Sequence, residues 1–220
     1  MAQLRRIKLS EHGLVSRRGL LVGTAAWLAT AAAPRAAWAG NQLEEPLADA
    51  VRSALAAAIG NKAPPKPRFD QVDARLAYLS WLGAMSAKLQ KRKSEALTRI
   101  EFLETLWYES KRAGLEPSMV LGLVQVESGF RKYAISSAGA RGYTQVMPFW
   151  ANSIGDGQAS RLFHMQTNLR FGCVILRHYL DRERGDMYLA LGRYNGSRGR
   201  PEYPNAVFGA RKQWLLPGEV

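Results

Sequence analysis

The feature that most constrains the fold is an apolar run that ends in a carboxylic acid. Residues 120–130 read VLGLVQVESGF. Residues three and four positions apart share one face of an α-helix, and Val120, Leu123 and Val124 occupy one such face. Glu127 is the next residue on that face. The run therefore predicts a core helix whose last inward-facing side chain is a glutamate.

Burial restricts the protonation state of a glutamate at this position. Burial of an unpaired carboxylate costs so much free energy that the group usually keeps its proton through a raised pKa. The negative end of the helix dipole also disfavours an anion there. A protonated, partly buried carboxyl beside a cleft is a general acid. The helix pattern leaves a second interpretation open, in which Glu127 caps a turn or pairs with Arg131 or Arg141.

Apolar residues at helical spacing predict further helices on both sides of this run. These helices are expected in residues 41–59, 69–89, 94–113, 162–180, 186–194 and around 206–214. The apolar stripe expected in the second of them is Phe69, Val72, Leu76, Leu79, Leu82, Met85 and Leu89. From Ser128 to Gly142 the periodicity fails and glycines accumulate. The sequence thus predicts a mainly α-helical fold with one long irregular segment after Glu127.

Residues 1–39 are interpreted as an export signal. Arg17 and Arg18 precede an apolar stretch of fourteen residues, and the following AWA supplies the small residues that a signal peptidase reads, with cleavage expected after Ala39. The stretch is shorter than the roughly 20 residues of a membrane span. The arginine pair is typical of twin-arginine export, with general secretion and a buried N-terminal helix as alternatives. Export predicts a periplasmic protein of a Gram-negative bacterium, without a membrane span after cleavage.

The net charge of +13 comes from 31 basic and 18 acidic residues. Six basic residues and one acid lie in residues 1–39, which leaves +8 for residues 40–220. Such a balance favours an anionic partner, either nucleic acid, a membrane surface or an acidic polymer. The densest basic patch, Lys88–Lys93, has no aromatic residues within it and is interpreted as a solvated helix face. Nucleic acid also conflicts with export, so we expect no nucleic-acid partner.

Cysteine and histidine usage points away from metal or disulfide chemistry. Cys173 is the single cysteine, so no intrachain disulfide can form. The three histidines are scattered and do not follow the spacing of a metal site. These residues indicate no metal site, and the family resemblance described below implies neither a metal nor an organic cofactor.

Residues 127–150, ESGFRKYAISSAGARGYTQVMPFW, resemble the catalytic segment of the soluble lytic transglycosylases, a branch of the lysozyme-like superfamily. That family has Glu-Ser, then Ser-x-Ala-Gly-Ala-x-Gly-Leu-x-Gln-x-Met-Pro. The residues in register are Ser136, Ala138, Gly139, Ala140, Gly142, Gln145, Met147 and Pro148. Downstream, ALGRYNGSRG is similar to the family's Ala-Leu-x-x-Tyr-Asn-Ala-Gly, and TNLRFG to its Asn-Ile-x-x-Gly. The chain departs from the pattern at Tyr143-Thr144, where Leu-Met is common, and at Gly196-Ser197, where Ala-Gly is common.

This resemblance covers about residues 100–210 and implies a lysozyme-like helical fold of the goose-type and SLT kind. We interpret residues 94–220 as the catalytic domain. Residues 40–93 form an N-terminal helical segment with a Pro-rich linker at 61–67, NKAPPKP. The sequence does not assign a role to this segment, which either packs on the catalytic domain or binds a partner.

The resemblance also implies the chemistry. Most glycosidases use two carboxylates, but residues 128–155 contain no Asp or Glu. In the family a lone glutamate, here Glu127, protonates the glycosidic oxygen of MurNAc-β-1,4-GlcNAc. It then takes the proton of the C6 hydroxyl that attacks C1, which leaves a 1,6-anhydro-MurNAc end. The partner is thus the peptidoglycan glycan strand, and protein partners are left open.

By the same resemblance, the glycan site is formed by Ser136, Gln145, Met147, Tyr194 and Asn195, and Tyr194 hydrogen-bonds or positions Glu127. Alternative roles stay open: Met147 and Tyr194 as core residues, and Ser136 and Gln145 as polar groups that stabilise the loop. Two other functions also stay open. One is a lysozyme-like hydrolase, and the other is a non-catalytic peptidoglycan-binding or assembly protein.

Overall fold

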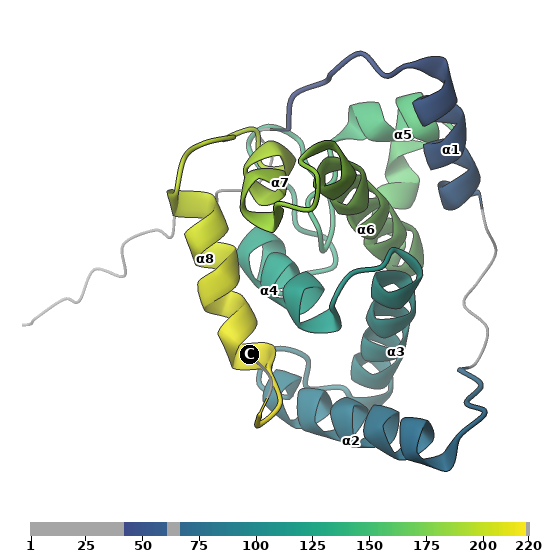
Figure 1. Ribbon diagram of the computed structural model, residues 1–220, viewed down its shortest axis with the longest axis vertical. Helices are drawn as coiled ribbons and strands as arrows, with labels where there is room; N and C mark the ends of the chain where they lie inside the picture. Colours follow the sequence, from purple (N-terminus) through teal and green to yellow (C-terminus); the bar gives the residue numbers. More distant parts are fainter. Residues whose placement is uncertain (1–41, 61–66, 219–220) are drawn as a thin grey trace, which may run out of the picture. The chain divides into compact units, whose positions relative to one another are not determined.

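The computed structural model describes residues 42–60 and 67–218 (Figure 1). The expected export signal and most of the Pro-rich linker lie outside these residues, so both remain predictions. In the described ranges no helix combines the length and the apolar character needed to cross a membrane.

The described residues are mainly helical and contain no β-strand, as the sequence predicts. In chain order the elements are α1 (Asp49–Ile59), α2 (Val72–Leu89), α3 (Ala96–Arg112), α4 (Pro117–Ser128), α5 (Pro148–Ile154), η1 (Ala159–Phe163), α6 (Met165–Arg182), α7 (Met187–Tyr194), α8 (Glu202–Arg211) and η2 (Lys212–Trp214). The expected irregular segment lies between α4 and α5. The apolar pattern missed α5, although Pro148 occupies its first turn, where proline is favoured.

Helix α4 forms the centre of the core. Val120, Leu121, Leu123 and Val124 are fully buried, and the helix lies between α3 and α8, with α6 and α7 nearby (Figure 1). Helix α8 packs along α4 at close range. A Cβ atom added to Gly122 of α4 would lie 2.8 Å from the backbone nitrogen of Arg211 in α8. The absence of a side chain at Gly122 therefore sets the distance between these two helices.

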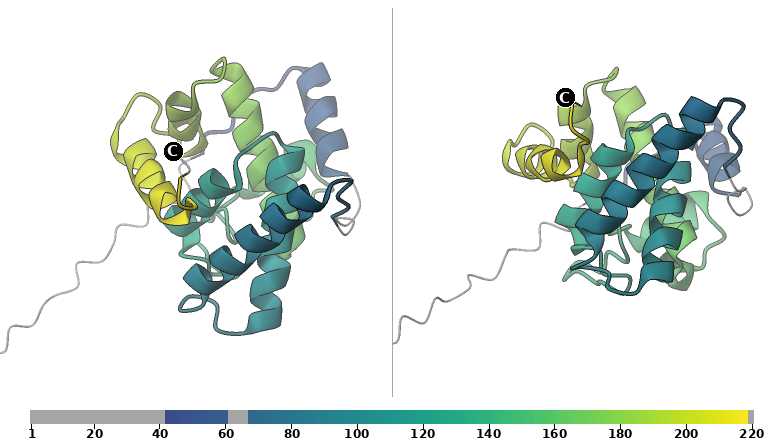
Figure 2. Two further views of the ribbon diagram at one scale, coloured as in Figure 1. Left: turned by 60° about the horizontal axis from the view of Figure 1, so that its bottom comes forward. Right: turned by 90° about the horizontal axis from the view of Figure 1, so that it is seen from below.

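Helix α2 lies against α3, as seen from below in Figure 2. Its buried residues are Tyr78, Trp81, Leu82, Met85 and Leu89. The apolar stripe predicted for this helix was therefore wrong in its first half, where Val72, Leu76 and Leu79 are exposed. The aromatic ring of Tyr78 packs edge-on against Trp107 of α3 at 4.8 Å between centroids. In the first half of α2 the aromatic residues are buried against α3, and the three aliphatic residues are left exposed.

Helix α1 packs on α5 and α6 rather than standing apart from them. Its last carbonyl groups are capped by two arginines of other helices: Arg112 donates to Ala58 O at 2.5 Å, and Arg170 to Ile59 O at 3.3 Å. Glu109, buried in α3, accepts from Arg170 at 2.8 Å. Residues 42–60 and 67–218 belong to one compact unit. The boundary predicted at residue 93 remains a prediction.

Candidate active site

Glu127 lies in the last turn of α4 and is only 5% exposed. The helix ends at Gly129, whose left-handed backbone (φ 59°) turns the chain away. Burial raises the pKa of Glu127 to about 8, because the charged form loses its hydration. Neither of the arginines considered as partners neutralises it. Arg131 donates to Ser128 O at 2.9 Å, and Arg141 lies over the ring of Phe163.

Tyr203 of α8 donates a hydrogen bond to Oε1 of Glu127, and both groups are buried. This bond favours the carboxylate and partly offsets the effect of burial on the pKa of Glu127. The other oxygen, Oε2, has no hydrogen-bonding partner in the described part of the chain. Glu127 is thus held by one oxygen and carries a free second oxygen. At neutral pH the proton of the acid belongs on Oε2.

The hydrogen bond to Glu127 expected from Tyr194 is therefore made by Tyr203. The Tyr194 hydroxyl donates instead to Thr144 O at 2.7 Å. Burial raises the pKa of Tyr194 well above its usual value, and the charge of Glu127 raises it further. Tyr194 therefore lies near the carboxyl. Sequence reasoning missed Tyr203. Its spacing with Val207 and Ala210 indicates a core-facing residue, but not its contact with a residue 76 positions earlier.

One side chain of α6 fixes the Gly-rich segment that follows α4. Asn168 donates to Arg141 O and Leu162 O, each at 2.8 Å, and accepts from Thr144 N at 2.8 Å. Gly142 has φ +77°, and a Cβ there would lie 2.4 Å from Nδ2 of Asn168. A glycine is required at this position for both reasons. The TNLRFG match thus corresponds to a structural contact with the irregular segment.

Within that segment the expected glycan-binding residues also stabilise the loop. The Ser136 hydroxyl accepts from Ala140 N at 3.1 Å. Gln145 is buried, and its amide nitrogen donates to Gly142 O at 2.8 Å and Ala134 O at 3.1 Å. Met147 is partly buried at the start of α5. The structural role that stayed open for Ser136 and Gln145 is therefore present, whatever else these residues bind.

Asn195 completes the set at the end of α7. It is buried, and its amide nitrogen donates to the Ser197 hydroxyl at 3.1 Å. Its carbonyl oxygen has no partner among the described residues. Buried polar atoms normally have a hydrogen-bonding partner. Asn195 Oδ1 is thus a buried acceptor whose hydrogen-bonding capacity the described residues leave unused.

The departure from the family pattern at Tyr143-Thr144 lies in the core. The Tyr143 ring packs on Phe102 at 4.9 Å between centroids, and its hydroxyl accepts from Lys93 Nζ at 2.8 Å. Thr144 is fully buried, and a Cβ added to Gly172 would lie 2.6 Å from its side chain. Both side chains point into the protein, and their contacts account for the substitution without a role in the chemistry.

The structure also contains a cavity of about 1290 Å³ between α2, α3 and the start of α6. Lys132 and Tyr143 lie on its wall, whereas Glu127 is not among the lining residues. The two acids that line the cavity, Glu101 and Glu104, are exposed to solvent. An exposed carboxyl does not acquire the proton affinity of a general acid at neutral pH. We therefore place the candidate active site at Glu127.

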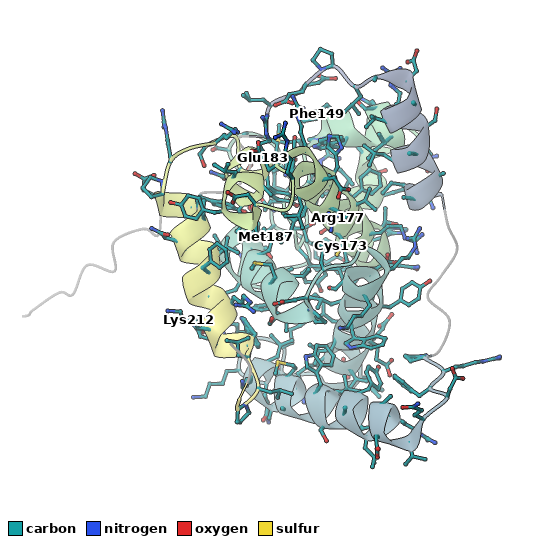
Figure 3. All side chains as sticks on the ribbon, in the orientation of Figure 1. Phe149, Cys173, Arg177, Glu183, Met187 and Lys212 are labelled. Carbon is teal, nitrogen blue, oxygen red and sulfur yellow. The ribbon has the colours of Figure 1, made fainter. Side chains whose placement is uncertain are left out.

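The cysteine and the possible metal ligands do not add to this chemistry. Cys173 lies in α6 (Figure 3), and burial raises the pKa of its thiol. Such a thiol is unreactive. In the described ranges no group of three or more His, Cys, Asp or Glu side chains could hold a metal ion.

The Tyr203 contact makes a testable prediction. Tyr203→Phe removes a hydrogen bond that favours the carboxylate, so the pKa of Glu127 rises further above about 8. We expect the alkaline limb of the kcat/KM profile to move to higher pH by on the order of one unit. Titration of activity from pH 5 to 10 measures this shift. Tyr188→Phe, on the neighbouring α7, is the control. An unshifted alkaline limb in Tyr203→Phe would contradict the role of Tyr203 in setting the pKa of Glu127.

Comparisons with known proteins assign the chain to a family. The family model described as "Transglycosylase SLT domain" matches residues 105–216. The chain is similar to a transglycosylase of Enterobacteria phage PRD1, with 33% identity over 121 residues, which cover 55% of this chain and 42% of that protein. It is also similar to membrane-bound lytic murein transglycosylase C of Actinobacillus pleuropneumoniae, with 34% identity over 114 residues, which cover 45% of this chain and 31% of that protein.

These curated relatives are longer proteins, and the chain spans less than half of their length. A solved structure of an inactive mutant of the lytic transglycosylase Slt from Pseudomonas aeruginosa aligns with a TM-score of 0.42 and 23% identity. That alignment covers 64% of this chain and 27% of the other. The family match and the helical structure together confirm the expected SLT-type helical domain.

Proposed function

The chain belongs to the transglycosylase SLT domain family, and we propose that it is a peptidoglycan lytic transglycosylase. The substrate would be the MurNAc-β-1,4-GlcNAc bond of glycan strands, cut without water to give 1,6-anhydro-MurNAc ends. One observation carries this proposal: a buried carboxyl, Glu127, whose pKa is raised to about 8 and whose Oε2 has no protein partner.

Glu127 would act twice. With a pKa of about 8 it is mostly protonated at neutral pH, so Oε2 can give its proton to the glycosidic oxygen as the bond from that oxygen to C1 breaks. The N-acetyl group of the substrate stabilises the cation at C1. The resulting buried carboxylate is a strong base and takes the proton of the C6 hydroxyl as its oxygen bonds to C1. The acid is then restored and no water is consumed.

No other acid of the described residues contributes to the pKa shift of Glu127. The next three acids after it in the sequence are engaged with arginines: Asp156 with Arg161, Asp181 with Arg177, and Glu183 with Arg198 at 2.7 Å. Glutamate acting alone favours attack by a substrate hydroxyl, because no protein group would activate water on the opposite face of the sugar. This distinguishes the proposal from a two-carboxylate hydrolase.

The glycan would lie against the segments that flank Glu127. We assign its contacts to Ser136, Gln145, Met147, Tyr194 and Asn195. The unpartnered Oδ1 of Asn195 supports the last of these, because it can accept a hydrogen bond from a sugar hydroxyl or N–H group. Relatives named membrane-bound lytic murein transglycosylase C support export to the periplasm, where the murein lies.

Digestion of purified sacculi by the chain that starts at residue 40, read by mass spectrometry of the soluble products, tests the proposal. We expect muropeptides that end in 1,6-anhydro-MurNAc, each lighter by one water than its reducing counterpart. Reducing ends alone would instead identify a lysozyme-like hydrolase. No soluble product, with retained binding to sacculi, would identify a non-catalytic peptidoglycan-binding protein.

A further inference from the structure

The segment before α1 places a polar side chain inside the protein and an apolar one outside. Gln42 is 5% exposed, whereas the next residue, Leu43, is 64% exposed. Burial of an amide costs free energy unless its polar atoms are hydrogen-bonded. The hydrophobic effect would favour the opposite arrangement, so specific partners must hold Gln42 inside.

Those partners lie on two separate elements. Gln42 Oε1 accepts from Trp150 Nε1 at 3.0 Å and from the main-chain nitrogen of Met147 at 3.4 Å. Both donors belong to the start of α5, which has no side-chain cap of its own. The Gln42 side chain also lies beside the Tyr194 hydroxyl, at the end of α7, and acts to lower the pKa of that hydroxyl against the larger, opposite effect of burial. One side chain thus connects the beginning of α5 with the end of α7.

These two ends carry separate parts of the glycan site. Met147 is an expected contact at the start of α5, and Tyr194 is one at the end of α7. Tyr194 also donates to Thr144 O, beside Gln145, and lies close enough to Glu127 for the carboxylate to affect its titration. Gln42 therefore touches residues that adjoin both the acid and the expected sugar contacts, without touching the acid itself.

The rest of the segment holds Gln42 in place. Glu45 forms ion pairs with Arg182 of α6 and with Arg193 of α7, the latter at 3.2 Å. Leu47 packs, partly buried, against the core. Because the residues that follow Gln42 are anchored in this way, insertion of Gln42 requires little further loss of chain entropy.

We propose that Gln42 is a positioning residue that holds the α5 and α7 parts of the glycan site in their relative places. This inference rests on the proposed function. Gln42 affects how tightly the sugar is bound, because it contacts the site residues Met147 and Tyr194. Proton transfer remains with Glu127. The N-terminal segment, which the sequence left without a role, is thereby part of the site.

Two variants separate the contacts of Gln42. Gln42→Met keeps the size of the side chain and removes its hydrogen bonds. Gln42→Glu keeps an accepting oxygen for Met147 and Trp150 but has no amide donor. On soluble, uncross-linked glycan strands we expect Gln42→Met to raise KM about tenfold with kcat nearly unchanged. Gln42→Glu should recover only part of the wild-type KM, because it keeps the α5 contacts and loses the amide that faces Tyr194. The chains should start at residue 40, without an N-terminal tag.

Arg52→Ala is the matched control, because Arg52 is exposed and lies in the adjoining α1, where it forms an ion pair with Asp49 and a hydrogen bond to Leu47 O. It should leave KM unchanged. A wild-type KM in Gln42→Met, or equal KM values in Gln42→Met and Arg52→Ala, would overturn the inference while leaving the proposed function intact. Absence of anhydro ends from the wild-type chain would instead overturn the proposed function.

A binding measurement tests the inference without turnover. Chitopentaose binding is compared between Glu127→Gln and the double variant that also carries Gln42→Met. We expect the Kd to be about tenfold weaker in the double variant. Equal Kd values would contradict the positioning role, whether or not the wild-type chain cleaves peptidoglycan.

Discussion

Glu127→Gln is expected to lower the rate of anhydro-muropeptide release from sacculi by about three orders of magnitude, in the middle of the range for loss of a general acid and base. The amide fills the same space and can still accept the hydrogen bond from Tyr203, but it neither gives nor takes a proton. Initial rates from mass spectrometry of the soluble products measure the loss. A rate above one tenth of wild type would show that another group provides the acid.

Glu116→Gln is the matched control for this substitution. It makes the same chemical change at the N-terminal end of α4, where the Glu116 side chain is 65% exposed and pairs with Arg211. An exposed pair of this kind contributes little to stability. We expect wild-type rates from this variant, so a joint loss of activity in both would indicate damage to α4 instead of loss of an acid.

The same substitution should change the pH dependence of stability. Glu127 has a folded-state pKa of about 8 against 4.5 for the free group, so the folded protein binds the proton more tightly than the unfolded chain. The stabilisation from this proton is complete below about pH 4.5 and is lost as pH rises through about 8. Glu127→Gln should therefore melt at the same temperature as wild type near pH 4.5 and at a higher temperature at pH 9. Thermal unfolding followed by circular dichroism at both pH values measures this.

Gly122→Ala is expected to destabilise the protein by about 1–3 kcal/mol, the usual cost of overpacking a core. The added Cβ would lie 2.8 Å from Arg211 N and 2.9 Å from Val207 O, which are backbone atoms of α8. Helix α8 must move away from α4, and Tyr203 moves with it. Chemical denaturation measures the loss of stability, and we expect activity to fall in the fraction that remains folded.

Gly83→Ala provides the control for this second substitution. Gly83 is also inside a helix, but a Cβ there meets nothing within 4 Å. Alanine is better than glycine in a helix by up to about 1 kcal/mol, so Gly83→Ala should stabilise the protein slightly. Changes of opposite sign in the free energy of unfolding would show that the loss in Gly122→Ala comes from the contact between α4 and α8. Equal stabilisation by both would show that the two helices are not in close contact in solution.

The sequence predicted the part of the site that depends on local spacing. Glu127 could be assigned to the inner face of α4 because three apolar residues at helical spacing precede it. The raised pKa followed from that position alone. The motif residues after it predicted the irregular segment, which Asn168 and Gly142 hold in its conformation.

Contacts between distant segments could not be predicted in the same way. Tyr203 and Gln42 are ordinary polar or aromatic residues in short segments, and their significance depends on which helix they meet. In α2 the spacing of aliphatic residues suggested one face, but Tyr78 and Trp81 bury another, because aromatic packing against α3 outweighs the aliphatic pattern. Periodicity predicts which residues can share a face, whereas tertiary packing decides which face is buried.

The hydrogen bond between Tyr203 and Glu127 also affects when, during synthesis and folding, Glu127 acquires its raised pKa. The donor belongs to α8, Glu202–Arg211, and is 76 residues from the acid in sequence. A nascent chain has Glu127 long before it has the helix that covers it. Until α8 docks on α4, water reaches this carboxyl and its pKa stays near that of a free glutamate. A half-synthesised or C-terminally clipped chain therefore has the glutamate but lacks the general acid.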